Sequence, residues 1–391
     1  MSMSRADVGD LRGISQMAFD AVGGLAGVVE RMHTTIQRHP VPFGVGRDIP
    51  AQGVTGVVYR GVRGGARWIG AGVDALLASV AGFLPDGDRS DGREAMAAVV
   101  NGIYGDYLAR TSNPLATDIS MRYGGRAIDP FDPGSSLRAA GARPAASKVL
   151  VLVHGLCMND LRWRRNGHDH GAVLADELGY SPLYLRYNSG LHIHQNGRQF
   201  SDLMEMLIQH WPVPVEELCI IGHSMGGLIA RSACDHAGES GHEWLLRLGK
   251  LVFLGTPHAG SPLERGGHWL DFMLDLSPYS APLTRAGKMR SAGIQDLRHG
   301  SVTADGRVVA LPRDVKCYTA AATLAKRRSL LADRLIGDGL VPLNSALGRH
   351  RDRSRSLGIP KSRQWIGYEM GHLDLLCRPD VYKQLRLWLA G

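Results

Sequence analysis

The sequence has little cysteine, few aromatic residues and no C-x-x-C pair. Its 391 residues include five cysteines, and aromatic side chains make up 6% of the chain. An odd number of cysteines without paired spacing argues against a disulfide framework. Cys219, Cys234 and Cys317 lie in or beside apolar segments, which predicts buried, reduced thiols of the kind found in cytoplasmic proteins.

Long apolar runs are also lacking. The best candidates, residues 17–29 and 68–84, are interrupted by Asp20 and Asp74, whereas a spanning helix needs about 20 apolar residues. Residues 1–11 contain two aspartates and no apolar stretch, so they lack the features of a secretory signal peptide. We expect a cytoplasmic protein without a membrane-spanning helix, and we leave association with a membrane surface open.

Internal repeats and a collagen-like glycine period are absent, although the chain has 50 glycines. This excludes solenoids, propellers and collagen. The net charge is +8, and the whole positive excess lies in residues 116–391, with clusters at Arg162–Arg165, Lys326–Arg328 and Arg349–Arg355. The clusters have the character of solvated loops. We expect no nucleic-acid partner, because such a partner needs basic residues gathered on one face.

The pattern of the chain changes near Asn113–Pro114. Residues 1–112 are rich in Ala, Gly and Val, and their apolar spacing predicts helices over 5–38, 52–84 and 91–110. We expect these residues to form a helical N-terminal extension that supplies no chemistry. Its partly polar helix faces suit either packing on the core or peripheral contact with a membrane.

Residues 113–391 alternate short apolar strands with helical segments. This alternation predicts an α/β fold with a mostly parallel sheet and helices on both faces. The expected strands cover residues 120–123, 126–128, 148–153, 181–187, 218–221, 250–254, 315–320 and 364–368, and the expected helices cover 170–178, 195–210, 225–237 and 379–389. Because ligands of such sheets bind at the carboxyl ends of the strands, we expect the catalytic residues there.

The clearest motif is Gly222-His-Ser224-Met-Gly226, a G-x-S-x-G sequence. An apolar strand ends before Gly222 and a helical run begins after Ser224, so the serine should lie on a sharp, strained turn above the sheet. Glycines at both ends of the motif avoid clashes with the neighbouring strand and helix. Ser224 is therefore the predicted nucleophile.

A nucleophilic serine needs a base and an orienting acid. His372 follows the last expected strand, and Asp338 lies in a loop after the preceding strand. We therefore predict a triad of Ser224, Asp338 and His372. Two other aspartates are weaker candidates for the acid: Asp333 lies in a helical segment and Asp352 in an Arg-rich loop. Two other histidines, His299 and His350, do not lie at the end of a strand.

An oxyanion hole needs two N–H donors. Met225 follows the nucleophile directly, and Leu156 lies in the loop after the strand at 148–153. We predict their backbone N–H groups as the two donors, with Gly155 allowing a sharp turn before Leu156. The histidines within these motifs are expected to make structural hydrogen bonds instead of acting in catalysis; they are His154, His223 and His258.

Together these motifs resemble those of the α/β-hydrolase superfamily. Val153–Leu156, Gly222–Gly227, Leu254–Pro262 and Gly337–Pro342 are similar to segments of bacterial lipases and of GPI inositol-deacylase-like esterases. The resemblance implies a serine carboxylic-ester hydrolase that acts on an apolar ester or lipid through an acyl-serine intermediate, without a cofactor. Two alternatives stay open: an acyltransferase with the same triad, and a non-catalytic scaffold that binds a membrane or a partner through residues 1–112.

The sequence predicts no metal site and no particular oligomeric state. Asp374 has the spacing from His372 at which some bacterial lipases bind calcium, but a polar or helix-capping role fits it better. The pairs His168–His170 and His192–His194 each lack a third ligand at readable spacing. Residues 261–300 are expected either to form a lid over the acyl pocket or to pack on the core.

Overall fold

The computed structural model describes residues 89–261, 291–326 and 337–391. The helices expected at 5–38 and 52–84 and most of the expected lid lie outside the described residues. The chain forms two compact units; Met1–Arg93 and Arg110–Leu115 make up one, and Glu94–Ala109 and Ala116–Gly391 make up the other. The division of the chain at residue 112 stays a prediction, and residues 94–109 belong to the unit that contains the sheet.

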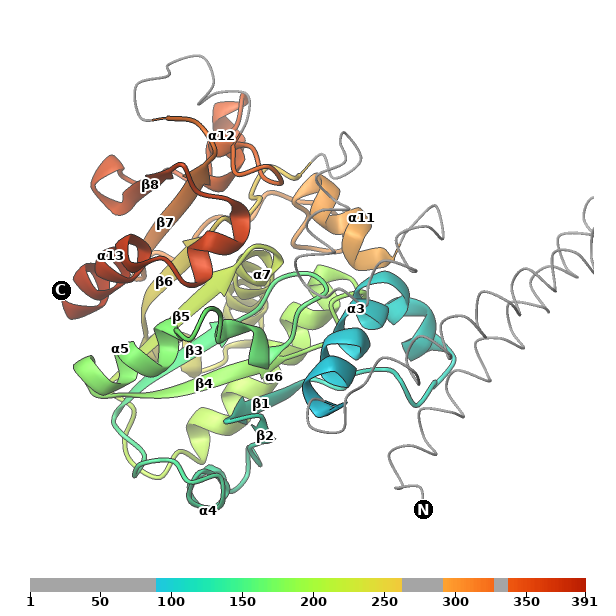
Figure 1. The fold of residues 1–391 in the computed structure, drawn as a ribbon, viewed down its shortest axis with the longest axis vertical. Coiled ribbons are helices and arrows are strands. Elements are labelled where there is room, and N and C mark those ends of the chain that lie inside the picture. Colours follow the sequence, from blue (N-terminus) through green and yellow to red (C-terminus); the bar gives the residue numbers. More distant parts are fainter. Residues whose placement is uncertain (1–88, 262–290, 327–336) are drawn as a thin grey trace, which may run out of the picture. The chain divides into compact units, whose positions relative to one another are not determined.

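One eight-stranded sheet organises the second unit (Figure 1), and its strand order is β2-β1-β4-β3-β5-β6-β7-β8. The strands are β1 (Ser120–Tyr123), β2 (Arg126–Ala127), β3 (Lys148–Val153), β4 (Tyr180–Arg186), β5 (Glu217–His223), β6 (Leu248–Leu254), β7 (Lys316–Thr323) and β8 (Gln364–Tyr368). The hairpin of β1 and β2 and the pairing of β1 with β4 are antiparallel. All other pairings are parallel.

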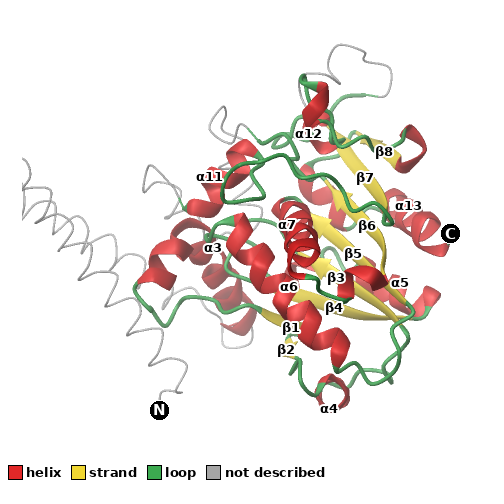
Figure 2. Cartoon of the chain, turned by 180° about the vertical axis from the view of Figure 1, so that it is seen from behind, coloured by secondary structure: helices red, strands yellow, loops and turns green. Residues whose placement is uncertain are grey.

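Helices lie on both faces of this sheet. The described helices of the chain are α3 (Arg89–Arg110), α4 (Pro133–Ala139), α5 (His170–Leu178), α6 (Ile193–Gln209), α7 (Met225–Ser240), α8 (Trp244–Arg247), α11 (Ala292–His299), α12 (Leu343–Ala346) and α13 (Pro379–Ala390). Figure 2 shows α6 and α7 in front of the strands, whereas α5 and α13 contact each other on the opposite face. The predicted fold class, α/β with a mostly parallel sheet, is confirmed. None of the described helices combines the length and apolar content that crossing a bilayer requires.

The core lies around the central strands because these strands are apolar on both faces. Residues Val149–Val153 of β3 and Leu218–Ile221 of β5 are fully buried. In the register of the sheet, Val153 pairs with Gly222 of β5, and the next residue of β5 pairs with Leu254 of β6. The carboxyl ends of these three strands therefore lie side by side, and the loops that carry the predicted site leave from them.

Candidate active site

Ser224 occupies the tight turn between β5 and α7. Its backbone has φ 53° and ψ −123°, a sparsely populated conformation that the surrounding structure must hold in place. A Cβ on Gly222 would lie 2.6 Å from the Gly227 backbone, and a Cβ on Gly226 would lie 2.2 Å from the Val153 carbonyl oxygen. The G-x-S-x-G spacing is thus explained by backbone atoms that approach the turn from both sides.

The turn is fixed to the neighbouring strands. The Ser224 N–H donates to the Leu254 carbonyl at 2.8 Å, and a Cβ on Gly155 would lie only 3.1 Å from the Ser224 Cβ. The His223 ring lies beside the His372 ring at a centroid distance of 4.8 Å, and its Nε2 is 3.3 Å from the His372 carbonyl oxygen. Ser224 and His372 are therefore brought to the same edge of the sheet.

His372 and Asp338 form a buried pair. His372 opens the turn after β8, Asp338 lies in the loop before α12, and each residue is 4% exposed. The His372 Nδ1 is 2.6 Å from the Asp338 Oδ2. The other carboxylate oxygen accepts the N–H groups of Leu340 at 3.0 Å and Val341 at 2.8 Å. Because a carboxylate only accepts hydrogen bonds, the proton of the neutral ring lies on Nδ1, and Nε2 can accept a proton.

Gly255 makes room for the His372 ring, a role that the sequence analysis did not assign. It directly follows β6 with φ +58°, and a Cβ there would lie 2.8 Å from the Leu375 Cδ1 and 3.1 Å from the His372 Cε1. Its N–H donates to the Ala320 carbonyl of β7 at 2.8 Å. The sequence signal for this role is a glycine placed directly after a strand end. Gly255 is therefore the position at which the end of β6, strand β7 and the turn that carries His372 contact one another.

Met225 directly follows Ser224, Leu156 directly follows Gly155, the residue that approaches Ser224, and both are buried. Among the described residues, no carbonyl oxygen accepts a hydrogen bond from either backbone N–H. Two donors thus stay available at the carboxyl edge of the sheet. A tight turn runs from Gly155 to Met158, where the Met158 N–H donates to the Gly155 carbonyl at 3.3 Å, and within it Cys157 has a left-handed φ of 60°. Gly155 is also required by its close approach to Ser224.

Part of α3 supports this loop. A Cβ on Gly102 would lie 2.2 Å from the Cys157 Sγ, and the Cys157 N–H donates to the Ser189 Oγ at 3.1 Å. The Ser291 hydroxyl at the start of α11 donates to the Gly102 carbonyl at 2.7 Å. Figure 1 shows α3 and α11 next to each other. Residues 94–109 thus hold the loop that carries Leu156, without placing a side chain of their own in the predicted triad.

Three other motif histidines are buried among structural contacts. Burial lowers the pKa of His154 to about 4, and it also holds the pKa of His223 and of His258 well below the usual value for histidine. The His154 ring stacks on Tyr187 at 4.2 Å. The His258 Nδ1 is 3.4 Å from the Arg231 Nη1. These surroundings agree with the structural roles expected for all three.

The remaining candidates from the sequence lie elsewhere or outside the described residues. Asp352 is exposed and accepts hydrogen bonds from Ser354. Asp374 accepts the Gly371 N–H at 2.9 Å, a local capping bond. Asp333 falls outside the described residues. His168 and His170 contact each other at 2.8 Å, Nε2 to Nδ1.

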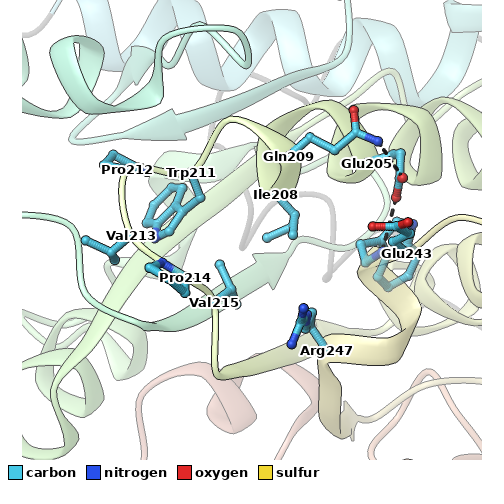
Figure 3. A pocket seen from close by; sticks show the side chains of 11 residues that line it. Glu205, Ile208, Gln209, Trp211, Pro212, Val213, Pro214, Val215, Glu243 and Arg247 are labelled. Carbon is cyan, nitrogen blue, oxygen red and sulfur yellow. Dashed lines mark hydrogen bonds between the residues drawn. The ribbon is translucent and has the colours of Figure 1, made fainter.

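A pocket of about 370 Å³ opens at another place on the molecule (Figure 3). It is lined by residues of α6, the Trp211–Val215 loop and α8, including Glu243 and Arg247. The loop leads into the amino end of β5, whereas Ser224 follows the carboxyl end of that strand. Seven strand residues span about 23 Å, so this pocket is separate from the candidate active site.

Comparisons with known proteins found one family model and several similar solved structures. Residues 147–316 match the family model of the PGAP1-like alpha/beta domain. The mature form of the Bacillus licheniformis lipase BlEst2 is 16% identical, with 70% of this chain and 97% of that chain covered at a TM-score of 0.43. Naproxen esterase from Bacillus subtilis is 14% identical, with 63% and 84% covered at a TM-score of 0.37. Phospholipase PlaB from Legionella pneumophila is 15% identical, with 51% and 45% covered at a TM-score of 0.37.

No curated protein sequence matches the chain. The strand order, the helices on both faces and the family match identify an α/β-hydrolase fold, and the resemblance to this superfamily is confirmed. The matched segment contains Leu156, Ser224 and Met225, whereas Asp338 and His372 lie beyond it. The fold and the family match support an ester hydrolase in general.

Proposed function

We propose that the chain is a serine hydrolase of carboxylic esters, with Ser224 as nucleophile, His372 as base and Asp338 as orienting acid. The observation that carries the proposal is the buried contact of 2.6 Å between Asp338 and His372, beside a serine held in a strained strand-to-helix turn. Burying a carboxylate is costly unless it is hydrogen-bonded. The two backbone N–H groups that donate to Asp338 offset this cost, and they orient its second carboxylate oxygen towards His372.

In the first step, the Ser224 Oγ attacks the ester carbonyl while His372 Nε2 takes the hydroxyl proton. The carbonyl oxygen becomes negative, and the N–H groups of Leu156 and Met225 stabilise this charge. The positive end of α7 adds to the stabilisation, because its first N–H groups face the turn. His372 then protonates the leaving alcohol as the carbon–oxygen bond breaks, and an acyl-serine forms.

In the second step, His372 removes a proton from water, and the resulting hydroxide attacks the acyl-serine. Collapse of the second tetrahedral intermediate releases the carboxylic acid, and the proton returns from His372 to the Ser224 Oγ. Asp338 stays ionised throughout and stabilises the imidazolium that forms twice in the cycle. The buried apolar residues next to the site in the chain, Leu156 and Met225, support an apolar acyl group as substrate.

A serine-reactive fluorophosphonate probe tests the proposal on the full chain. We expect the wild-type protein to be labelled and to hydrolyse p-nitrophenyl esters, and we expect Ser224→Ala to do neither while keeping its far-UV circular dichroism. Ser232→Ala is a matched control, because Ser232 is a buried serine of α7 outside the proposed site. Labelling of folded Ser224→Ala at the wild-type level would refute the assignment of the nucleophile.

The same experiment separates the alternatives. Wild-type protein that is folded but never labelled would favour the non-catalytic scaffold. Wild-type protein that has not been treated with the probe is then incubated with an ester and a competing alcohol. This distinguishes a hydrolase from an acyltransferase, because both use the same acyl-serine but release different products. We expect the free carboxylic acid as the main product.

A further inference from the structure

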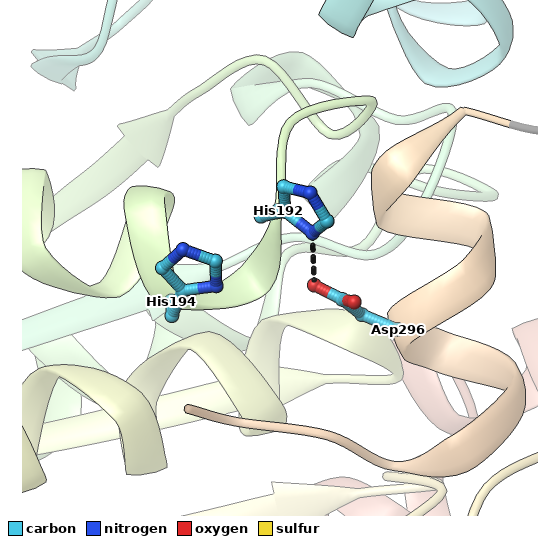
Figure 4. A group of neighbouring side chains, drawn as sticks. All are labelled: His192, His194 and Asp296. Atoms are coloured by element: carbon cyan, nitrogen blue, oxygen red, sulfur yellow. Dashed lines mark hydrogen bonds and ion pairs between the residues drawn. The ribbon is translucent and has the colours of Figure 1, made fainter. Parts of the chain in front are cut away.

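The structure places a carboxylate next to two histidines, His192 and His194, that have no third metal ligand close to them in the sequence. Asp296 of α11 reaches the start of α6, where its Oδ2 lies 3.0 Å from the His192 Nδ1. His194 completes the group, and one ligand atom of each of the three residues lies within 4.8 Å of the others. Figure 4 shows the three side chains gathered between the two helices.

The local backbone explains why the two histidines lie together. Side chains two positions apart within a helix point about 200° apart. His192, however, is the residue before the helix, with φ −52° and ψ 141°. Its ring therefore stacks on the His194 ring, with a centroid distance of 5.0 Å and an angle of 29°. Ile193 between them is fully buried and anchors this end of α6.

The carboxylate and the imidazoles have the properties of metal ligands. The Asp296 Oδ2 also accepts the Ile193 N–H at 2.9 Å, and bonds of this kind orient a ligating carboxylate. The Asp296 side chain is 16% exposed and that of His192 is 43% exposed, so water can reach the group.

We propose that His192, His194 and Asp296 form a Zn²⁺ site, with water as the fourth ligand. Imidazole and carboxylate donors suit zinc, and bond lengths near 2.1 Å in a tetrahedral site place neighbouring ligand atoms about 3.4 Å apart. The 3.0 Å between His192 and Asp296 is close to that spacing. The proposal requires the His194 side chain to rotate towards the other two ligands, because the three ligand atoms lie up to 4.8 Å apart.

The site would join α11 to α6 next to the candidate active site. A Cβ on Gly293 of α11 would lie 2.9 Å from the Met225 Cε and 2.2 Å from the Ser189 carbonyl oxygen. A zinc ion bound through Asp296 therefore fixes the helix that packs on Met225. This effect on the active site rests on the proposed function, whereas zinc binding itself does not.

Zinc binding by the full chain tests the site. Protein stripped with EDTA is titrated with ZnCl₂ by calorimetry, and its thermal unfolding is followed with and without zinc. Among the described residues, the His194 side chain makes no hydrogen bond, so His194→Ala should leave the metal-free unfolding temperature unchanged. We expect this variant to lose about 100-fold or more in zinc affinity and to lose the zinc-dependent rise in unfolding temperature.

His236→Ala is the matched control. His236 belongs to a second group, with Asp202 and His242, that offers the same ligand types, but Arg198 Nε lies 4.0 Å from the Asp202 carboxylate and competes for it. We expect this control to bind zinc like the wild type. Zinc affinity that is equal in His194→Ala and wild type, or lost only in His236→Ala, would overturn the proposal, as would wild-type protein that binds no zinc.

Discussion

Replacing Asp338 by asparagine tests the proposed active site most sharply, because the change preserves shape and removes only the charge. Asp338 Oδ1 accepts two backbone N–H groups, from Leu340 and Val341. An asparagine must keep its carbonyl oxygen on those two donors, because an NH₂ group facing them would be unpaired. Its NH₂ group then faces His372 Nδ1.

A donor at this position reverses the histidine tautomer. Nδ1 has to accept a hydrogen bond, so the ring proton moves to Nε2, and Nε2 can no longer take the proton of Ser224. The same change in a serine-protease triad lowers kcat about 10⁴-fold. At about 1.36 kcal/mol for each factor of ten, this corresponds to about 5.5 kcal/mol of transition-state stabilisation. We expect a loss of that order in Asp338→Asn.

The assay is steady-state hydrolysis of a short p-nitrophenyl ester, with urea unfolding as the test of folding. Asp352→Asn is the control, because Asp352 is exposed and the hydrogen bonds made by its side chain within the described residues are to Ser354 alone; we expect its kcat within twofold of wild type. Folded Asp338→Asn with kcat within tenfold of wild type would refute the reasoning. A crippling effect of Asp333→Asn instead would place the acid at that rival position.

Three further predictions follow from the same contacts. His372→Ala should lower kcat by about 10⁴-fold or more with folding intact, and near-normal turnover would exclude it as the base. Gly255→Ala should lower kcat and the unfolding temperature together, because its Cβ would displace the His372 ring; unchanged kinetics would contradict this contact. Burial lowers the pKa of His154 to about 4 and of His170 to about 3, while the unfolded value is about 6.5. Below pH 6.5 the unfolded chain binds more protons, so the free energy of unfolding should fall by about 2 kcal/mol per histidine from pH 7 to pH 5, and His170→Gln should reduce that slope in urea titrations.

The sequence alone determined the features that depend on local pattern. Short apolar runs, at residues 148–153, 218–221 and 250–254, predicted the central strands, because a strand buried on both faces needs such a run. The junction of strand, G-x-S-x-G and helix predicted the strained turn at Ser224, because the required glycines lie within two residues of it. Asp338 and His372 were found as a pair from their places after successive strands, since the ends of parallel strands share one edge of the sheet.

Only the tertiary structure decided the contacts between distant segments. Gly255 approaches His372, Gly102 approaches Cys157, and Asp296 reaches His192 across 104 residues of sequence. No periodic pattern encodes these contacts, because they depend on how the crossover connections stack helices and loops on the sheet. For the same reason, the sequence pattern assigned residues 94–109 to a separate extension. A helical pattern shows which residues form a helix, but tertiary packing determines which part of the protein the helix contacts.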